Sequence, residues 1–249
     1  MTQLRIVTYN VRRCLGMDGR LSPRRIADVL HGSKPDIVAL QELDVGRLRS
    51  DGIDQAKAIA DALSMQLHFH PAMRVFEELY GDAILTTYPS QLIKAGALPG
   101  SAGKEPRGAL WVRMQIEGQS LDVINTHLGL RSVDRRLQTG ALLGPDWVGH
   151  SPGRPRLILT GDFNTIPRSR TYRRLTASLD DAQKLAGPSA ATFPSPLPLL
   201  RLDHFFVGPG IRVIRTGAIK SDLARLASDH LPLMMDFSLE PAATEPDMP

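Results

Sequence analysis

The residues of this chain that could do chemistry follow short hydrophobic runs, which are typical of buried strands. The clearest run is Leu-Ile-Leu at 157–159, which Gly161 interrupts before Asp162 and Asn164. Alternation along an extended chain places these two polar side chains on the same side of the strand end, roughly 6–7 Å apart. A carboxylate and an amide held there can address one phosphate, one metal ion or one water molecule. An isolated Gly-Asp-x-Asn is more often an ordinary turn, so this interpretation depends on the rest of the chain.

Other predicted strands of the chain also end, or begin, on polar side chains. The complete set of these groups is Asn10, Glu42, His127, Asp162, Asn164, Asp203, Asp229 and His230. It contains four carboxylates, two imidazoles and two amides. A set of oxygen ligands without thiolates favours Mg²⁺ over zinc, with Mn²⁺ as a substitute. In sites of phosphoryl chemistry, Mg²⁺ is usually held by one or two carboxylates. The histidines can serve as acids or as donors to developing charge. Each group taken singly is also typical of a turn or a strand edge.

The elements that must position these groups are about ten short strands with few, short helices. The segments 4–10 and 36–42 are predicted strands, residues 110–116 and 121–125 a predicted hairpin, and Tyr80-Gly81 the turn between two further strands. This pattern indicates two packed sheets with helices outside. We found no internal repeat and no linker, so residues 1–240 are predicted to form a single domain and residues 241–249 a flexible C-terminal tail.

Composition sets the class of protein. The 249 residues are 42% hydrophobic and 22% charged, which is ordinary for a globular protein. No run approaches the ~18 apolar residues of a membrane span, and the first residues enter a strand pattern at once, so we expect a cytoplasmic protein and a monomer. The single cysteine, Cys14, excludes an internal disulfide and a cysteine-based zinc site.

Basic residues follow the polar strand ends. The net charge is +4, with 24 arginines and 6 lysines; Arg131 comes soon after His127 and Arg168 soon after Asn164. Each arginine cluster taken singly fits a solvated helix face. Their recurrence favours a positive rim around one site, which suits a polyanionic ligand.

The order and spacing of six motifs resemble those of the endonuclease/exonuclease/phosphatase superfamily, which includes pancreatic-type deoxyribonuclease, abasic-site endonucleases, neutral sphingomyelinases and inositol-polyphosphate phosphatases. The resemblance implies a four-layer α/β/β/α sandwich of two mixed, mainly antiparallel sheets, with the site at one end of the sheets. The motifs are Thr8-Tyr9-Asn10, Gln41-Glu42, Asn125-Thr126-His127-Leu128, Gly161-Asp162-Phe163-Asn164, Arg201-Leu202-Asp203-His204 and Ser228-Asp229-His230.

The resemblance also implies roles for the matched residues. Glu42 corresponds to the principal metal ligand, with Asn10 and Asp229 nearby. Asp162 corresponds to the group that activates the attacking water, and Asn164 to its partner in holding the phosphate. The remaining matched residues are Asp203, which corresponds to the residue that orients His230 against the scissile phosphate, and His127, a candidate proton donor to the leaving oxygen.

Two positions refine this comparison. A histidine at position 127 resembles the deoxyribonuclease and sphingomyelinase branches rather than the abasic-site endonucleases. Where many relatives have Gly-Asn-Ala, this chain has Gly81-Asp82-Ala83, which either adds a carboxylate near the site or forms a turn.

The favoured hypothesis is a Mg²⁺-dependent phosphodiester hydrolase that acts on nucleic acid, with Arg131, Arg168 and Asn164 as substrate contacts. The main alternative is a phospholipase C-like or sphingomyelinase-like enzyme that acts on a phospholipid surface through the apolar loop 193–200. A phosphatase is a further alternative. A binding module that has lost its chemistry is disfavoured, because all five candidate groups are intact: Glu42, His127, Asp162, Asp203 and His230.

Overall fold

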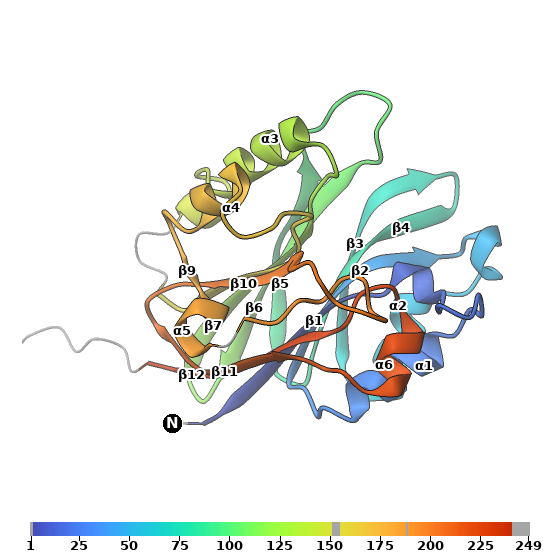
Figure 1. The fold of residues 1–249 in the computed structure, drawn as a ribbon, viewed down its shortest axis with the longest axis horizontal. Coiled ribbons are helices and arrows are strands. Elements are labelled where there is room, and N and C mark those ends of the chain that lie inside the picture. The colour runs from blue at the N-terminus through green and yellow to red at the C-terminus, as the bar shows by residue number, and fades with distance from the viewer. Residues whose placement is uncertain (1, 151–154, 188, 241–249) are drawn as a thin grey trace, which may run out of the picture.

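The computed structural model describes residues 2–150, 155–187 and 189–240 (Figure 1). The predicted tail, residues 241–249, lies outside the described residues. The strands are β1 (Leu4–Asn10), β2 (Ile37–Val45), β3 (Gln66–Val75), β4 (Glu78–Thr86), β5 (Ser90–Leu98), β6 (Arg107–Ile116), β7 (Gln119–His127), β8 (Leu157–Asp162), β9 (Asp180–Asp181), β10 (Asp203–Val207), β11 (Ile211–Ala218) and β12 (Leu233–Leu239). The α-helices are α1 (Pro23–His31), α2 (Gln55–Leu63), α3 (Ser132–Leu142), α4 (Arg170–Leu175), α5 (Ala182–Ala186) and α6 (Asp222–Ala227).

Over the described residues the strands form two six-stranded sheets, in the orders β11-β12-β1-β2-β4-β3 and β5-β6-β7-β8-β10-β9. The central pairs β1/β2 and β7/β8 are parallel, and the other pairs are antiparallel. Helices α1, α2 and α6 lie outside the first sheet, and α3 and α4 outside the second (Figure 1). The predicted four-layer sandwich of two mixed sheets is therefore confirmed.

Both faces of the central strands are buried, which explains their continuous hydrophobic runs. In β1, Ile6 faces the other sheet, whereas its neighbour Val7 packs under the outer helices with Leu30. In β8, Ile158 points into the layer between the sheets and Leu159 points under α3 and α4. The period-two alternation of a strand thus supplies all three hydrophobic layers from one run of residues.

The expected turn at Tyr80-Gly81 was wrong, because both residues lie inside β4 and the hairpin turns at 76–77. Gly81 instead allows two strands to pack closely. A Cβ at Gly81 would lie 1.9 Å from the backbone oxygen of His70, so glycine allows β3 to approach β4 closely at the irregularity near Pro71. Strand β5, which contains polar residues and a glycine, was not predicted.

The topology brings the polar strand ends to one edge of the sandwich. The carboxyl ends of β1, β2, β7 and β8 all lie there, because each parallel pair runs to the same edge and the ends of β1 and β8 meet across the sandwich. Strands β10 and β12 run antiparallel to β8 and β1, so their amino ends lie at that edge too. No helix among the described residues is long and apolar enough to cross a membrane.

Candidate active site

A bulge in β2 directs Glu42 toward the site. The register with β4 shifts between Leu40 and Leu43, and Glu42 has a left-handed φ of 63°. Such a bulge re-aims a side chain at the end of a strand. Gln41 therefore points between the sheets, where its Nε2 donates to Asn125 Oδ1 at 2.7 Å and so ties the sheets together beneath the site.

Asn10 joins the carboxylate of the first sheet to that of the second. Its Nδ2 donates at 3.0 Å both to Glu42 Oε1 and to Asp162 Oδ2, and its Oδ1 accepts from the backbone N–H of Arg12. Burial raises the pKa of Glu42, and the hydrogen bond from Asn10 works in the opposite direction. The buried carboxylate of Asp162 and the half-buried carboxylate of Glu42 thus share one amide nitrogen, an arrangement that a cation would stabilise.

Asp162 is positioned by the backbone on both sides of it. Gly161 has a φ of 136°, and a Cβ there would lie 1.8 Å from the carbonyl oxygen of Thr126, so this strand end needs glycine. After the strand, the backbone N–H of Asn164 donates to Asp162 Oδ1 at 2.8 Å. Burial raises the pKa of Asp162 above the ordinary aspartate value, while the positive charge of His230 lowers it. A carboxylate with a raised pKa suits a proton acceptor.

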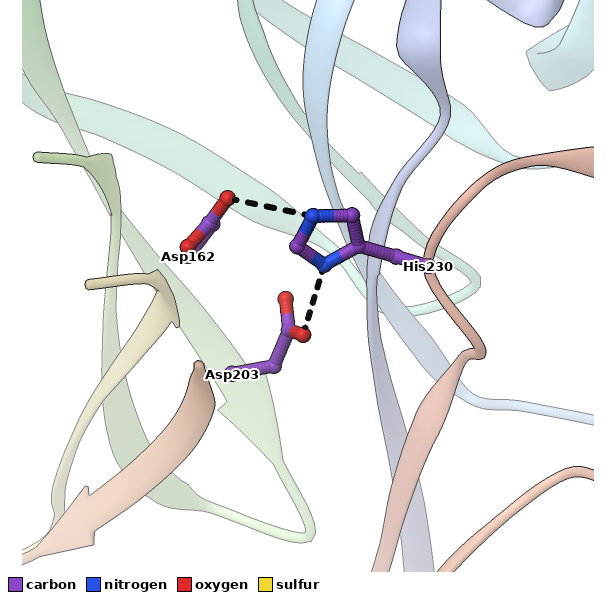
Figure 2. Close-up of side chains that lie close together, drawn as sticks. All are labelled: Asp162, Asp203 and His230. Carbon is purple, nitrogen blue, oxygen red and sulfur yellow. Dashed lines mark hydrogen bonds and ion pairs between the residues drawn. The ribbon is translucent and has the colours of Figure 1, made fainter. Parts of the chain in front are cut away.

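His230 lies between two carboxylates (Figure 2). Its Nδ1 is 2.9 Å from Asp203 Oδ2 and its Nε2 is 3.7 Å from Asp162 Oδ2. Thr192 donates its hydroxyl to the same oxygen of Asp203. Burial lowers the pKa of His230, but the charges of Asp203 and Asp162 outweigh burial and raise it to about 10. The ring is therefore an imidazolium at neutral pH, as expected for an oriented dyad.

His127 has the opposite electrostatic environment. Burial and the nearby charge of Arg107 lower its pKa well below the ordinary histidine value, so the ring is neutral. Arg107 NH1 lies 2.8 Å from His127 Nδ1. Because an arginine can only donate, Nδ1 accepts and the ring hydrogen lies on Nε2. Arg107 was not predicted as a site residue.

The N–H of His127 Nε2 faces another hydrogen-bond donor, the side-chain amide nitrogen of Asn164. Asn164 Nδ2 lies 3.1 Å away and is fixed as a donor because it also bonds the backbone oxygen of Leu128 at 2.9 Å. The carboxylates of Asp162 and Glu42 are 3.5 Å and 3.9 Å from Nε2. Two N–H donors thus converge where an anionic oxygen would satisfy both, and the predicted pairing of Asn164 with the phosphate fits this geometry.

The remaining predicted residues lie around this centre. Asp229 interacts electrostatically with Glu42, and its Oδ2 lies 3.5 Å from Arg12 Nε. Asp82 is buried and interacts electrostatically with Glu42 and Asp162, so this position adds a carboxyl group near the site rather than forming a turn. Burial raises the pKa of Asp82 to about 7. Arg131 lines a small pocket with Arg107, whereas Arg168 is exposed on the loop after Asn164.

Two sets of side chains could hold a metal ion. Asp162, Asp203 and His230 offer ligand atoms within 4.8 Å of one another, but the His230 ring is already engaged by both carboxylates. Glu42 and Asp229 lie at the neighbouring position, together with Asn10, whose Oδ1 has a second lone pair available. The oxygen-only composition of this second set fits a hard divalent cation.

Comparison with known proteins identifies the class that this fold and site define. The model of the endonuclease/exonuclease/phosphatase family matches residues 7–230, and the chain therefore belongs to this family, whose members are phosphoester hydrolases. The predicted superfamily is confirmed, and the matched residues extend from the first central strand to His230.

Particular relatives add no further detail of the activity. The chain is 28% identical over 247 residues to the uncharacterized protein YbhP of Escherichia coli strain K12, covering 94% of this chain and 96% of that protein. A solved endonuclease/exonuclease/phosphatase structure from Beutenbergia cavernae has a TM-score of 0.77 at 24% identity, covering 96% of this chain and 72% of that one. The mannosyl-6-phosphatase Bt3783 of Bacteroides thetaiotaomicron also has a TM-score of 0.77, at 21% identity, covering 95% and 100%. These two structures support the fold alone.

Proposed function

We propose that the protein is a divalent-metal-dependent phosphodiesterase that cleaves nucleic acid. The observation that carries the chemistry is the arrangement of His230 between Asp203 and Asp162, with the donors of His127 and Asn164 beside it. A carboxylate that can take a proton, a charged imidazolium and two neutral donors around one position suit an anionic phosphate and the charge that develops on it.

The environments of the residues support a role for each of them. Asp162, whose pKa is raised, accepts the proton of the attacking water. His230 is charged and has a proton to give to the leaving oxygen. His127 is neutral, so we propose that it donates a hydrogen bond to a phosphoryl oxygen rather than acting as the acid expected from the resemblance. Asn164 donates beside it.

A divalent cation would be held by Glu42 and Asp229, with the amide oxygen of Asn10 as a third ligand. Mg²⁺ is the proposed ion, with Mn²⁺ as a substitute, because these three residues offer oxygen donors and no thiolate. When bound, such an ion supplies positive charge to the phosphoryl oxygens. Asn10 positions Glu42 against Asp162 through its amide nitrogen.

Nucleic acid is the proposed substrate class because arginines surround the site. Arg131 borders the pocket beside Arg107, Arg168 is exposed just beyond Asn164, and further exposed arginines lie on α3 and α4. Contacts to backbone phosphates supply most of the non-specific affinity for nucleic acid, and arginine provides such contacts in bidentate form.

One observation favours the phospholipid alternative. In the loop between α5 and β10, Leu197 and Leu199 are 67% and 71% exposed, and the ring of Phe193 packs 4.9 Å from that of His230. Exposed leucines on a loop that also contacts a catalytic side chain could enter a bilayer surface.

Binding measured against salt separates the two substrate classes. We would use the inactive Asp162→Asn variant with duplex DNA and with neutral phospholipid vesicles. Three or four phosphate contacts predict a slope of about −3 in log affinity against log salt. A flat slope on DNA, with vesicle binding lost in Leu197→Ser, would replace nucleic acid by phospholipid. Turnover on DNA, RNA, sphingomyelin and a phosphomonoester identifies the preferred class and tests the phosphatase alternative.

A further inference from the structure

A cleft of about 480 Å³ lies between α3 and α4, next to the candidate active site. Four arginines line it, and among its described lining residues there is no carboxylate. The rest of the lining consists of hydroxyl side chains and one valine: Ser132, Thr139, Thr165, Ser169, Thr171 and Val133. Arginine and hydroxyl donors without an acceptor of negative charge are complementary to a phosphate group.

The arginines of the cleft are available for a ligand. Arg136, Arg170 and Arg174 are exposed, and no ion pair joins any of the four to a described carboxylate. The fourth, Arg135, is fixed by the backbone oxygens of Gly129 and Leu130, which it reaches through NH1. Its buried Nε, like the buried Oγ1 of Thr139, has no hydrogen-bond partner in the described residues. Two buried polar atoms thus lack partners in a cleft that can admit a polar ligand.

The cleft lies beside the candidate active site. Thr165 lines the cleft and follows directly after Asn164, which lies against His127. Arg135 interacts electrostatically with Asp162 from the other wall. Helices α3 and α4 lie side by side over the second sheet, at the opposite side of the molecule from α1 and α6 (Figure 1). A chain-like substrate with its scissile phosphate at the site could therefore extend into the cleft.

We propose that the α3–α4 cleft is a second phosphate-binding subsite, which holds a phosphate of the substrate other than the one being hydrolysed. The inference rests on the proposed function, because it places both phosphates on one nucleic-acid strand. The second phosphate comes either from a neighbouring phosphodiester or from a terminal phosphomonoester of the strand. Binding there lowers KM for substrates with more than one phosphate and makes their affinity depend on salt.

The test compares substrates with one phosphate and with two. The thymidine dinucleotide TpT has a single phosphodiester, TpTpT adds a second phosphodiester, and pTpT adds a terminal phosphate. The variant is Arg136→Gln with Arg174→Gln. The control, Arg24→Gln with Arg212→Gln, removes the same charge from α1 and β11. Bis-p-nitrophenyl phosphate, with one phosphate and no further chain, provides the reference rate for the catalytic centre of each protein.

The wild type and the control should cleave TpTpT or pTpT with a kcat/KM at least ten-fold above that for TpT. In the cleft variant this ratio should fall ten-fold or more, mainly through KM. On longer single strands the salt slope should flatten by about 1.4, since each lost contact contributes about 0.7. If the ratio falls for pTpT alone, the cleft binds a terminal phosphate. If the ratio falls for TpTpT, the cleft binds a backbone phosphate. Unchanged ratios in the variant would overturn the subsite.

A binding measurement keeps the subsite testable if the proposed function fails. The dissociation constant of inorganic pyrophosphate is measured by calorimetry in excess chelator, for the wild type and both double variants. The subsite predicts at least a ten-fold rise for Arg136→Gln/Arg174→Gln and little change for the control. Equal affinities in all three proteins would contradict it. Failure of the wild type to hydrolyse any nucleotide substrate would overturn the proposed function alone.

Discussion

Nδ1 of His230 lies 2.9 Å from Oδ2 of Asp203, and Nε2 of the same ring faces Asp162 at 3.7 Å. Asp203 comes from the start of β10 and His230 from the segment before β12, so the pair joins the two sheets at the edge that carries the candidate active site. The contact explains why a buried ring remains charged: the two carboxylates outweigh the cost of burial.

The first prediction concerns this dyad. Asp203→Asn removes the charge that favours the imidazolium, so the pKa of His230 should fall from about 10 and the alkaline limit of activity should move to lower pH. The losses in His230→Ala and Asp203→Ala should be strongly non-additive if the residues act as a dyad. Full pH profiles of the single and double variants measure both effects. An unmoved alkaline limit or additive losses would show that the two residues are not coupled.

The second prediction concerns Arg107. Burial and the charge of Arg107 keep the pKa of His127 low, so Arg107→Gln should raise that pKa. Ring NMR signals of His127 should then titrate at higher pH than in the wild type. His204, whose pKa is lowered to about 4 mainly by burial, is the internal control and should not change. An unchanged His127 titration would refute the assigned role of Arg107.

The third prediction concerns the strand end at Gly161. Gly161→Ala should destabilise the protein by about 3 kcal/mol or more, because both the left-handed backbone and the carbonyl of Thr126 exclude a side chain. Gly217→Ala is the matched control, since a Cβ there meets nothing within 4 Å. Urea denaturation should show a loss in the first variant and a change within about 0.5 kcal/mol in the second. Equal free energies of unfolding for the two variants would contradict the argument that a side chain at position 161 clashes with Thr126.

The fourth prediction concerns the dependence of stability on pH. Burial would raise the pKa of Asp236, but hydrogen bonds from Arg5 and Arg215 outweigh it and lower the pKa. A lowered folded-state pKa stabilises the protein above the unfolded value of about 3.9, and the effect is lost as pH falls through the folded value. Asp236→Asn should therefore cost about 1–3 kcal/mol at pH 7 and progressively less below about pH 4. A difference that persists at low pH would contradict this linkage.

The sequence predicted well which polar residues gather at one edge of the sandwich, because they directly follow buried strands. Asp162 and Glu42 could be found from the hydrophobic runs alone, and the family resemblance supplied the pairing of Asp203 with His230. The bulge that directs Glu42 could not be predicted, because it depends on the register with β4. The many short strands predicted two packed sheets with helices outside, and the family resemblance implied the four-layer sandwich.

Other parts of the site depend on tertiary contacts. The register of the β6–β7 hairpin gives a local signal for Arg107, since continuing the pairing of Ala109 with Thr126 places Gly108 opposite His127 and Arg107 one residue further along. No such local signal exists for Thr192, whose contact with Asp203 joins a loop to a strand. The arginine cleft depends on how α3 and α4 pack, which the spacing of arginines along the sequence does not determine.

The fifth prediction tests the central claim, that a metal ion held at Glu42 and a carboxylate base at Asp162 hydrolyse a phosphodiester. The measurement is the rate of bis-p-nitrophenyl phosphate hydrolysis with Mg²⁺ or Mn²⁺, in excess chelator and after the metal is restored. Chelation should abolish activity reversibly, Glu42→Gln should raise the metal concentration required, and Asp162→Asn should lower kcat by ~10² or more with little change in KM. Full activity in excess chelator, or an Asp162→Asn variant as fast as the wild type, would contradict the account.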